Sequence, residues 1–368
     1  MTIEATTVGA TFEGLRQRLG DQVPDFELLC KAELVYQINQ LKWQRNAVIL
    51  GHNYMEAALY HGVADHVGDS LELSRIAATS PADLIIFCGV RFMAETAKIL
   101  SPRKTVLLPS LEAGCSLASS ITAADVRELR RAYPGVPVIS YVNSCADVKA
   151  ESDACCTSSN AARVVESFDS RTIIFLPDEF LAGNLARETG RHIVFPVPEA
   201  SITRAADSDV DRVIVGWRGR CEVHERFTVD DIRRVRADFP DVTVIAHPEC
   251  SPDVVGASDF SGSTSSMIRH VRESTSHRFL LLTECSMGDN ICAENPDKEL
   301  LRLCSVRCPH MQTITLQDTL ASLESNVHVI EVPSETAVKA RKALDYMLRV
   351  GAPVSPSHAV GVSTPAAG

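Results

Sequence analysis

Three cysteines occupy comparable places in three separate parts of the sequence. Cys115 lies in LEAGCSLA and Cys221 in RGRCEVHE, each directly after an apolar, β-branched run, and Cys308 lies in VRCPHM beyond a third such run. Ligand sites form at the carboxyl ends of the strands in open parallel sheets, so a ring of three domains would bring these thiolates together. Three thiolates without a fourth equivalent favour a [4Fe–4S] cluster with one iron free to bind substrate.

The other nine cysteines have less specific interpretations. Cys88 lies within an apolar run and Cys30 on an amphipathic segment, so we expect both to be structural. Four more lie near the proposed site without a counterpart in every repeat: Cys145, Cys155, Cys156 and Cys250. Three stay open: Cys285, Cys292 and Cys304. The C-x3-C spacing of Cys304 and Cys308 would also suit a disulfide or a zinc site.

Polar residues end the first apolar run of each repeat. They are His52 and Tyr54, Tyr141 and Asn143, and His247 and Glu249. About 16 to 18 residues later a hydroxyl stands at a predicted helix start: Ser70, Ser158, and Ser263 with Thr264. Free N–H groups at helix N-termini attract anions, so three converging helix starts would bind an acidic small molecule. One alternative is that these hydroxyls only cap their helices. A separate alternative is that His52 and His247 are core residues whose hydrogen bonds are made with the backbone.

The segments that carry these residues alternate between strand-like and helical patterns. The apolar runs fall into three groups: 46–54, 83–90 and 104–110; 136–144, 171–178 and 211–217; 241–249, 277–284 and 326–334. The groups begin roughly 90 and 105 residues apart, which is the spacing of domains. Near-continuous Val, Ile and Leu runs separated by helices predict an α/β fold with short parallel sheets.

Composition limits the class of protein. The chain has 368 residues, 45% of them hydrophobic and 23% charged, as in globular proteins. A net charge of −11 without a basic stripe argues against a nucleic-acid partner. No apolar run approaches the roughly 20 residues of a membrane span, and no signal peptide is visible. We therefore expect a cytoplasmic protein without a membrane partner, in which cysteines serve more often as metal ligands than as disulfides.

Twelve segments in order resemble the quinolinate synthases of de novo NAD biosynthesis. They are GHNY (51–54), GDSLELS (68–74), FMAETAKIL (92–100), EAGCSLA (112–118), YVNS (141–144), KAESDACCTSSNA (149–161), FLPDEFLA (175–182), WRGRCEVHERF (217–227), AHPEC (246–250), SGSTSSM (261–267), LLTE (281–284) and CPHM (308–311). The similarity extends from about residue 28 to residue 350. Some members carry a C-x2-C-x2-C run where this chain has only Cys304 and Cys308.

The resemblance implies three homologous α/β/α three-layer domains around a pseudo-threefold axis. We place the repeats at 28–122, 123–230 and 231–334, so that each holds one of the three cysteines. Residues 1–27 form an N-terminal extension, and 335–350 a helix that packs back on the first repeat. The Pro-, Ala- and Ser-rich tail, 351–368, is expected to be disordered.

The resemblance also implies the chemistry. The family condenses iminoaspartate with dihydroxyacetone phosphate to quinolinate, phosphate and water, and an L-aspartate oxidase would be a natural source of the imine. Cys115, Cys221 and Cys308 would hold a [4Fe–4S] cluster whose open iron acts as a Lewis acid in dehydration. The expected substrate contacts are His52, Ser70, Tyr141, Asn143, Ser158, His247, Glu249, Ser263 and Thr264. The expected catalytic residues are Tyr54, Tyr141, Asn143, His247 and Glu249.

Three other functions compete with this one. A different cluster-dependent dehydratase would share the chemistry. An iron–sulfur sensor or electron carrier would need a fourth thiolate, from Cys304 or Cys285. A zinc hydrolase would use His224, which lies three residues after Cys221. A dinucleotide dehydrogenase is poorly supported, because no GxGxxG follows an early strand.

Overall fold

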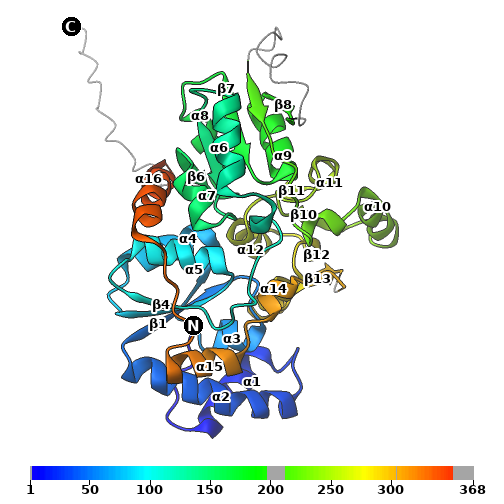
Figure 1. The fold of residues 1–368 in the computed structure, drawn as a ribbon. Helices are drawn as coiled ribbons and strands as arrows, with labels where there is room; N and C mark the ends of the chain where they lie inside the picture. The colour runs from blue at the N-terminus through cyan, green and yellow to red at the C-terminus, as the bar shows by residue number, and fades with distance from the viewer. Residues whose placement is uncertain (1, 197–211, 304, 351–368) are drawn as a thin grey trace, which may run out of the picture.

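The computed structural model of the chain describes residues 2–196, 212–303 and 305–350. Over these residues three separate sheets, all of parallel strands, alternate with helices. Figure 1 shows the second sheet and its helices in green at the top, above the blue and cyan elements of the first. The α/β class with short parallel sheets, predicted from the apolar runs, is confirmed.

The first sheet has the strand order β2-β1-β3-β4. Its strands are β1 Ala47–His52, β2 His66–Gly68, β3 Leu84–Cys88 and β4 Thr105–Leu107. Its helices are α3 Ala57–Gly62, α4 Ser70–Thr79 and α5 Arg91–Leu100. Every residue of β3 is buried, as in a parallel strand that is covered on both faces.

The second sheet has the order β6-β5-β7-β9-β8. Its strands are β5 Val138–Tyr141, β6 Ala154–Cys156, β7 Thr172–Leu176, β8 His192–Val194 and β9 Val213–Val215. Its helices are α6 Ala123–Ala132, α7 Ala146–Ala150, α8 Ala161–Glu166 and α9 Glu179–Thr189. A 3-10 turn, η1 Ala118–Ser120, leads into this part of the chain, and a second, η2 His224–Arg226, leads out of it.

The third sheet has the order β11-β10-β12-β13. Its strands are β10 Thr243–Ala246, β11 Phe260–Ser261, β12 Arg278–Leu282 and β13 Glu299–Arg302. Its helices are α10 Val229–Asp238, α11 Pro252–Ala257, α12 Thr264–Glu273 and α13 Cys285–Glu294. In all three sheets the first strand along the chain lies between the second and the third, so the sheets share one topology.

Helices at both ends of the chain complete the described part. They are α1 Val8–Leu19, α2 Asp25–Gln44, α14 Pro309–Gln312, α15 Leu316–Ser325 and α16 Ser334–Val350. The segment 1–27, expected as an extension, contains α1, which packs on α2 and α3 and buries Leu15 and Leu19. Among the described helices, none has the length and apolar character that crossing a membrane requires.

The C-terminal helix α16 lies against two repeats. We expected residues 335–350 to pack on the first repeat, and α16 does contact α5 there, but it also contacts α7, α8 and β6 of the second. Four small or apolar side chains make up its buried face: Ala340, Ala343, Leu344 and Met347. The tail 351–368, predicted to be disordered, lies outside the described residues.

The predicted strand at 326–334 is wrong. The edge of the third sheet is formed by β13 instead, and 326–334 makes one isolated antiparallel bridge, from Val329 to Leu107 of the first sheet. The physical reason is that a short apolar run does not determine its own partner. Here α15 packs on α2 and β3, so the chain that follows it returns to the first sheet. Four strands of two or three residues were not predicted: β2, β6, β8 and β11.

Candidate active site

One pocket collects side chains from the strand ends of all three sheets. His52 ends β1 and Tyr54 follows it, Tyr141 ends β5 and Asn143 follows it, and His247 and Glu249 follow β10; all six line the pocket. Ser70, Ser158 and Thr264 line it as well. Parallel strands present their carboxyl ends at one edge of a sheet, which explains why residues so distant in sequence meet. The chemical roles expected for them stay predictions.

The three predicted cluster cysteines line this same pocket. Cys115, Cys221 and Cys308 come from the three repeats, and all are free thiols. Burial is the main cause that raises the thiol pKa to about 12 in Cys115 and to about 11 in Cys308, and that raises it strongly in Cys221. The cysteines also act on one another. Cys308 raises the pKa of the Cys115 thiol, and Cys115 raises the pKa of the Cys221 thiol.

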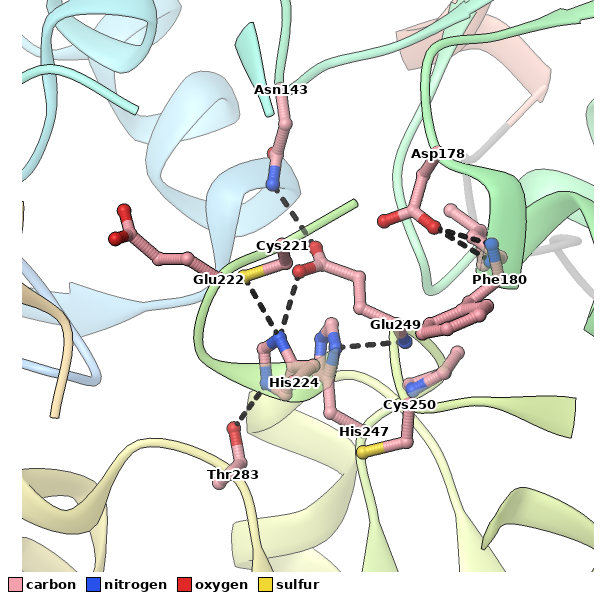
Figure 2. Close-up of polar contacts among 12 residues, drawn as sticks. Asn143, Asp178, Phe180, Cys221, Glu222, His224, His247, Glu249, Cys250 and Thr283 are labelled. Atoms are coloured by element: carbon pink, nitrogen blue, oxygen red, sulfur yellow. Dashed lines mark hydrogen bonds and ion pairs between the residues drawn. The ribbon is translucent and has the colours of Figure 1, made fainter. Parts of the chain in front are cut away.

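Glu249 lies at the centre of a hydrogen-bond network that joins the second and third repeats (Figure 2). Its Oε1 accepts from the Tyr141 hydroxyl at 2.6 Å and from Asn143 Nδ2 at 3.0 Å. Its Oε2 lies 2.9 Å from His224 Nδ1. Burial alone would raise the pKa of this carboxyl, but His224, His247 and the Tyr141 hydroxyl outweigh it and lower the pKa. Glu249 is therefore ionised.

His224 is a site residue that sequence reasoning named only as a possible zinc ligand. Its Nδ1 lies 3.2 Å from Cys221 Sγ, and its Nε2 lies 2.8 Å from Thr283 Oγ1. Thr283 Oγ1 in turn lies 2.6 Å from the Tyr54 hydroxyl. A continuous chain of polar contacts thus connects Glu249 to Tyr54 through His224. The available signal was its position three residues after Cys221, in the turn η2 and not at a strand end.

His52 and His247 lie at the carboxyl ends of β1 and β10: His52 is the last residue of β1, and His247 directly follows β10. Each accepts a backbone N–H through Nδ1, from Tyr54 at 3.2 Å and from Glu249 at 3.3 Å. Burial lowers the pKa of His52 to about 4 and of His247 to about 3, so both rings are neutral at pH 7. A neutral ring whose Nδ1 accepts carries its proton on Nε2. In each ring Nδ1 therefore accepts a hydrogen bond from the backbone, and Nε2–H is a donor.

Two of the predicted helix-start hydroxyls do not cap their helices. Ser70 is the first residue of α4, and the cap is Asp69, whose side chain accepts from the backbone of Leu71 and Glu72. Ser158 lies in a turn before α8, and the residue that precedes α8 is Asn160. The hydroxyls of Ser70 and Ser158 are thus not used as caps, and both residues line the pocket.

Ser263 departs from the prediction in a different way. It does cap α12, accepting from the backbone of Ser266, and it lines a neighbouring cavity of about 700 Å³ instead of the pocket. As a cap, the Ser263 hydroxyl accepts from the backbone of its own helix, and it also contacts Asp69, which lines the pocket. Thr264, the first residue of α12, lines the pocket.

Comparison with known proteins identifies the family. The family model described as quinolinate synthetase A protein matches residues 36–349. The chain belongs to the quinolinate synthase family. Quinolinate synthase 2 of Mesorhizobium japonicum is 49% identical over 345 residues, 94% of this chain and 100% of the relative. The quinolinate synthase of Agrobacterium fabrum is 49% identical over 336 residues, 91% of both chains. That of Xylella fastidiosa (strain 9a5c) is 50% identical over 313 residues, 85% of this chain and 86% of the relative.

The cysteines of this quinolinate synthase family member fit an iron–sulfur cluster. Three sulfur donors line one pocket, and soft thiolate ligands are those that iron–sulfur clusters use. Burial raises the pKa of these thiols, and a bound cation reverses such a shift because it stabilises the thiolate. The three cysteines are therefore able to serve as the ligands of a cationic cluster.

The remaining cysteines of this family member contribute no further thiolate to the pocket within the described residues. Four are fully buried: Cys88, Cys155, Cys156 and Cys250. Cys30 is exposed, and Cys145 and Cys292 are partly buried. Cys285 is disulfide-bonded and does not line the pocket. It is therefore not positioned to supply the fourth thiolate that an iron–sulfur sensor would need. Cys308 is a free thiol, which contradicts its alternative as half of a disulfide; Cys304 lies outside the described residues.

A mononuclear metal site is a second possibility within the same pocket. Ligand atoms of Cys221, His224 and Glu249 lie within 4.8 Å of one another, and sulfur, nitrogen and oxygen donors are all accepted by zinc. That arrangement uses one of the three cysteines and leaves Cys115 and Cys308 without a role. The cluster uses all three.

Proposed function

We propose that this protein condenses iminoaspartate with dihydroxyacetone phosphate to form quinolinate, phosphate and water. The observation that carries this proposal is one pocket lined by three cysteines from three repeats, an ionised Glu249 and donors suited to anions. Membership of the quinolinate synthase family supports the same reaction. An enzyme that oxidises L-aspartate, in the same cytoplasmic compartment, would supply the unstable imine.

The three cysteines are proposed as the ligands of a [4Fe–4S] cluster. Such a cluster, when bound by Cys115, Cys221 and Cys308, supplies a Lewis-acidic iron that assists the departure of an oxygen during dehydration. Every other function in the pocket falls to side chains of the chain itself.

Substrate anions are proposed to bind where hydroxyls and helix starts meet. Ser70 and Thr264 are the first residues of α4 and α12, where the helix dipole favours negative charge and their hydroxyls are available as donors. Ser158 adds a third hydroxyl, and the neutral rings of His52 and His247 each add an Nε2–H donor. Together they suit a phosphate and two carboxylates without requiring a cationic side chain. Ser263 would act indirectly, by capping α12.

Glu249 is proposed as the group that moves protons. Because it is ionised and buried, it is ready to accept a proton from the substrate, and its contacts with Tyr141 and Asn143 hold it in one orientation. Burial raises the pKa of Tyr54 well above its ordinary value, so its phenol stays protonated and acts as a donor. The contacts through His224 and Thr283 connect these two groups, and positioned proton transfer contributes about 10²- to 10⁴-fold to rates.

The proposal is tested by purifying the protein without oxygen and measuring iron, sulfide, the electronic spectrum and quinolinate formation on one sample. Cys115→Ser, Cys221→Ser and Cys308→Ser should each abolish both the chromophore and the product. Cys30→Ser, at an exposed cysteine on α2, is the matched control and should change neither. A ligand variant that kept the cluster and the activity would remove that cysteine from the proposal.

A zinc hydrolase is the second candidate, favoured by the proximity of Cys221, His224 and Glu249. The same variants separate the two functions. Under this alternative Cys221→Ser loses the metal while Cys115→Ser and Cys308→Ser retain it, and metal analysis finds zinc without sulfide. Under the cluster proposal all three variants lose iron and sulfide together.

A further inference from the structure

Asp178 is a buried carboxyl with one unpartnered oxygen. It follows Pro177 after β7 and is fully buried. Its Oδ1 caps α9, accepting the N–H of Phe180 at 2.8 Å and of Leu181 at 2.9 Å. Its Oδ2 is buried as well and has no hydrogen-bond partner in the described part of the chain. Figure 2 shows Asp178 on the α9 side of the site that contains Glu249, with both cap contacts made by the same oxygen.

The charged and titratable groups that act on Asp178 come from several elements. They are Glu249 after β10, Tyr141 at the end of β5, Cys250 beside Glu249, Glu179 of α9 and Arg220 in the loop that leads to Cys221. Arg220 is paired with Glu179 at 3.0 Å, so its charge is already compensated. Burial raises the pKa of Tyr141 and of Cys250, so both are neutral. Among the charged groups that act on Asp178, the Glu249 carboxylate has the largest effect and disfavours a second negative charge.

The two carboxyls differ in how well they support a negative charge. Glu249 has three donors, from Tyr141, Asn143 and His224, and is the better anion. An ionised Asp178 would leave a buried oxygen unpaired beside it, and uncompensated buried charges are usually removed by protonation. The N-terminus of α9 favours a charge, but the carbonyl oxygen of a neutral acid accepts the same two N–H groups. A proton on Oδ2 therefore removes the buried charge and leaves both cap contacts of Oδ1 in place.

We propose that Asp178 is a second carboxyl of the reaction site, held as the neutral acid, and that it acts through Glu249 as a positioning residue. By keeping its proton, it confines the negative charge of the pair to Glu249. This inference rests on the function proposed above for Glu249. Burial, and next the charge of Glu249, raise the pKa of Asp178 well above its ordinary value, in agreement with the geometry. Neighbouring carboxyls whose environments push their pKa values apart are a recurrent device of acid–base sites.

The proposal makes the two carboxyls interdependent. When the charge of Glu249 is removed, the repulsion that keeps the proton on Asp178 weakens, and Asp178 should ionise at lower pH. Glu249→Gln removes this charge while it keeps the shape of the side chain. A structural cap without electrostatic contact with Glu249 would show no such change.

Infrared titration of the resting, cluster-loaded protein tests this without any turnover. The difference spectrum between wild type and Asp178→Asn should contain the C=O stretch of a protonated carboxylic acid at pH 7. Other protonated carboxyls, such as Glu284 with a pKa raised to about 7, cancel in this difference. In a Glu249→Gln background the band should disappear at lower pH. Absence of the band at pH 7, or an unchanged titration in that background, overturns the proposal whether or not the protein makes quinolinate.

Rescue by the conservative variant provides a second test. Asn caps helices about as well as Asp and is always neutral, so Asp178→Asn should keep kcat/KM at pH 7 within about threefold of wild type. Asp178→Ala, which loses the cap and the neutral acid, should lower it further. Thr228→Ala removes the cap of α10 at an exposed site and controls for the loss of a cap. An Asp178→Asn variant as impaired as Asp178→Ala would contradict the proposal.

Discussion

Tyr141 donates a 2.6 Å hydrogen bond to Glu249 and so joins the end of β5 in the second sheet to the end of β10 in the third. Both residues are buried, and 108 residues of chain separate them. The bond favours the charged form of Glu249 and contributes to its lowered pKa. The state of the proposed acid–base group therefore depends on how two repeats are placed relative to each other.

Tyr141→Phe should move the acid limb of activity toward higher pH. The hydroxyl lowers the pKa of Glu249, so its removal raises that pKa, and Glu249 stays protonated up to a higher pH. A hydrogen bond to a charged group contributes about 1.5–3 kcal/mol, so the shift of the acid limb should be measurable. The measurement is the pH profile of kcat/KM. Tyr133→Phe, at a partly buried tyrosine outside the pocket, is the control; a profile that Tyr141→Phe left in place would separate this hydroxyl from the acid–base group.

Glu249→Gln should stop turnover and leave the cluster intact. The amide keeps the shape of the side chain but does not accept a proton, and loss of such a group costs about 10²- to 10⁴-fold in kcat. The iron and sulfide content and the electronic spectrum should match those of wild type. Glu225→Gln, at an exposed glutamate in η2, should behave as wild type in both respects. Normal turnover by Glu249→Gln would assign proton transfer to another group.

Six of the site residues predicted from sequence lie where an apolar run ends. The polar residues after β1, β5 and β10 were found because a strand pattern stops immediately before them. His224 was not placed in the site, because it lies in a 3-10 turn and its partners Glu249 and Thr283 belong to another repeat. Asp178 also follows a strand, but no cysteine or repeated pattern drew attention to it.

The errors in the fold have a similar cause. The run at 326–334 has more β-branched residues than 299–302, yet 299–302 forms β13 and 326–334 does not pair with the third sheet. Pairing depends on where the preceding helices pack, and a single sequence does not contain that information locally.

His310→Ala should make the cluster less durable in air. His310 Nε2 lies 3.1 Å from Glu222 Oε1, next to Cys221, and its Nδ1 lies 3.5 Å from the carbonyl of Glu112, in the Cys115 loop. The ring thus contacts residues near Cys221 and Cys115 and is itself two residues from Cys308, so its loss should loosen the segments that hold the three proposed ligands. The measurement is the rate at which the chromophore bleaches after exposure to oxygen. His277→Ala, at an exposed histidine beside β12, is the control, and equal bleaching rates in both variants would contradict the expectation.

Lys42→Met should destabilise the protein without altering the pocket. Lys42 is buried on α2, and its Nζ donates to Asp65 Oδ1 and the Val63 carbonyl at 2.8 Å each, and to Thr2 Oγ1 at 2.9 Å. Methionine fills a similar volume but leaves the Asp65 carboxylate and the carbonyl without this donor, at a cost of about 1–3 kcal/mol in unfolding free energy. Urea unfolding under anaerobic conditions measures this cost as a lower midpoint at an unchanged slope.

The control for Lys42 is Lys31→Met on the same helix. Lys31 pairs with Glu56 at 2.8 Å near the surface, and ion pairs in such positions contribute about 0–1 kcal/mol. Solvent replaces a lost partner there, whereas the groups around Lys42 lie where α2 meets the chain between α3 and β2 and are largely shielded from water. The two variants remove the same charge from the same helix, so any difference between them measures burial. Equal midpoints would show that Asp65 recovers its solvation when Lys42 is lost, and that this contact does not hold α2 on the first sheet.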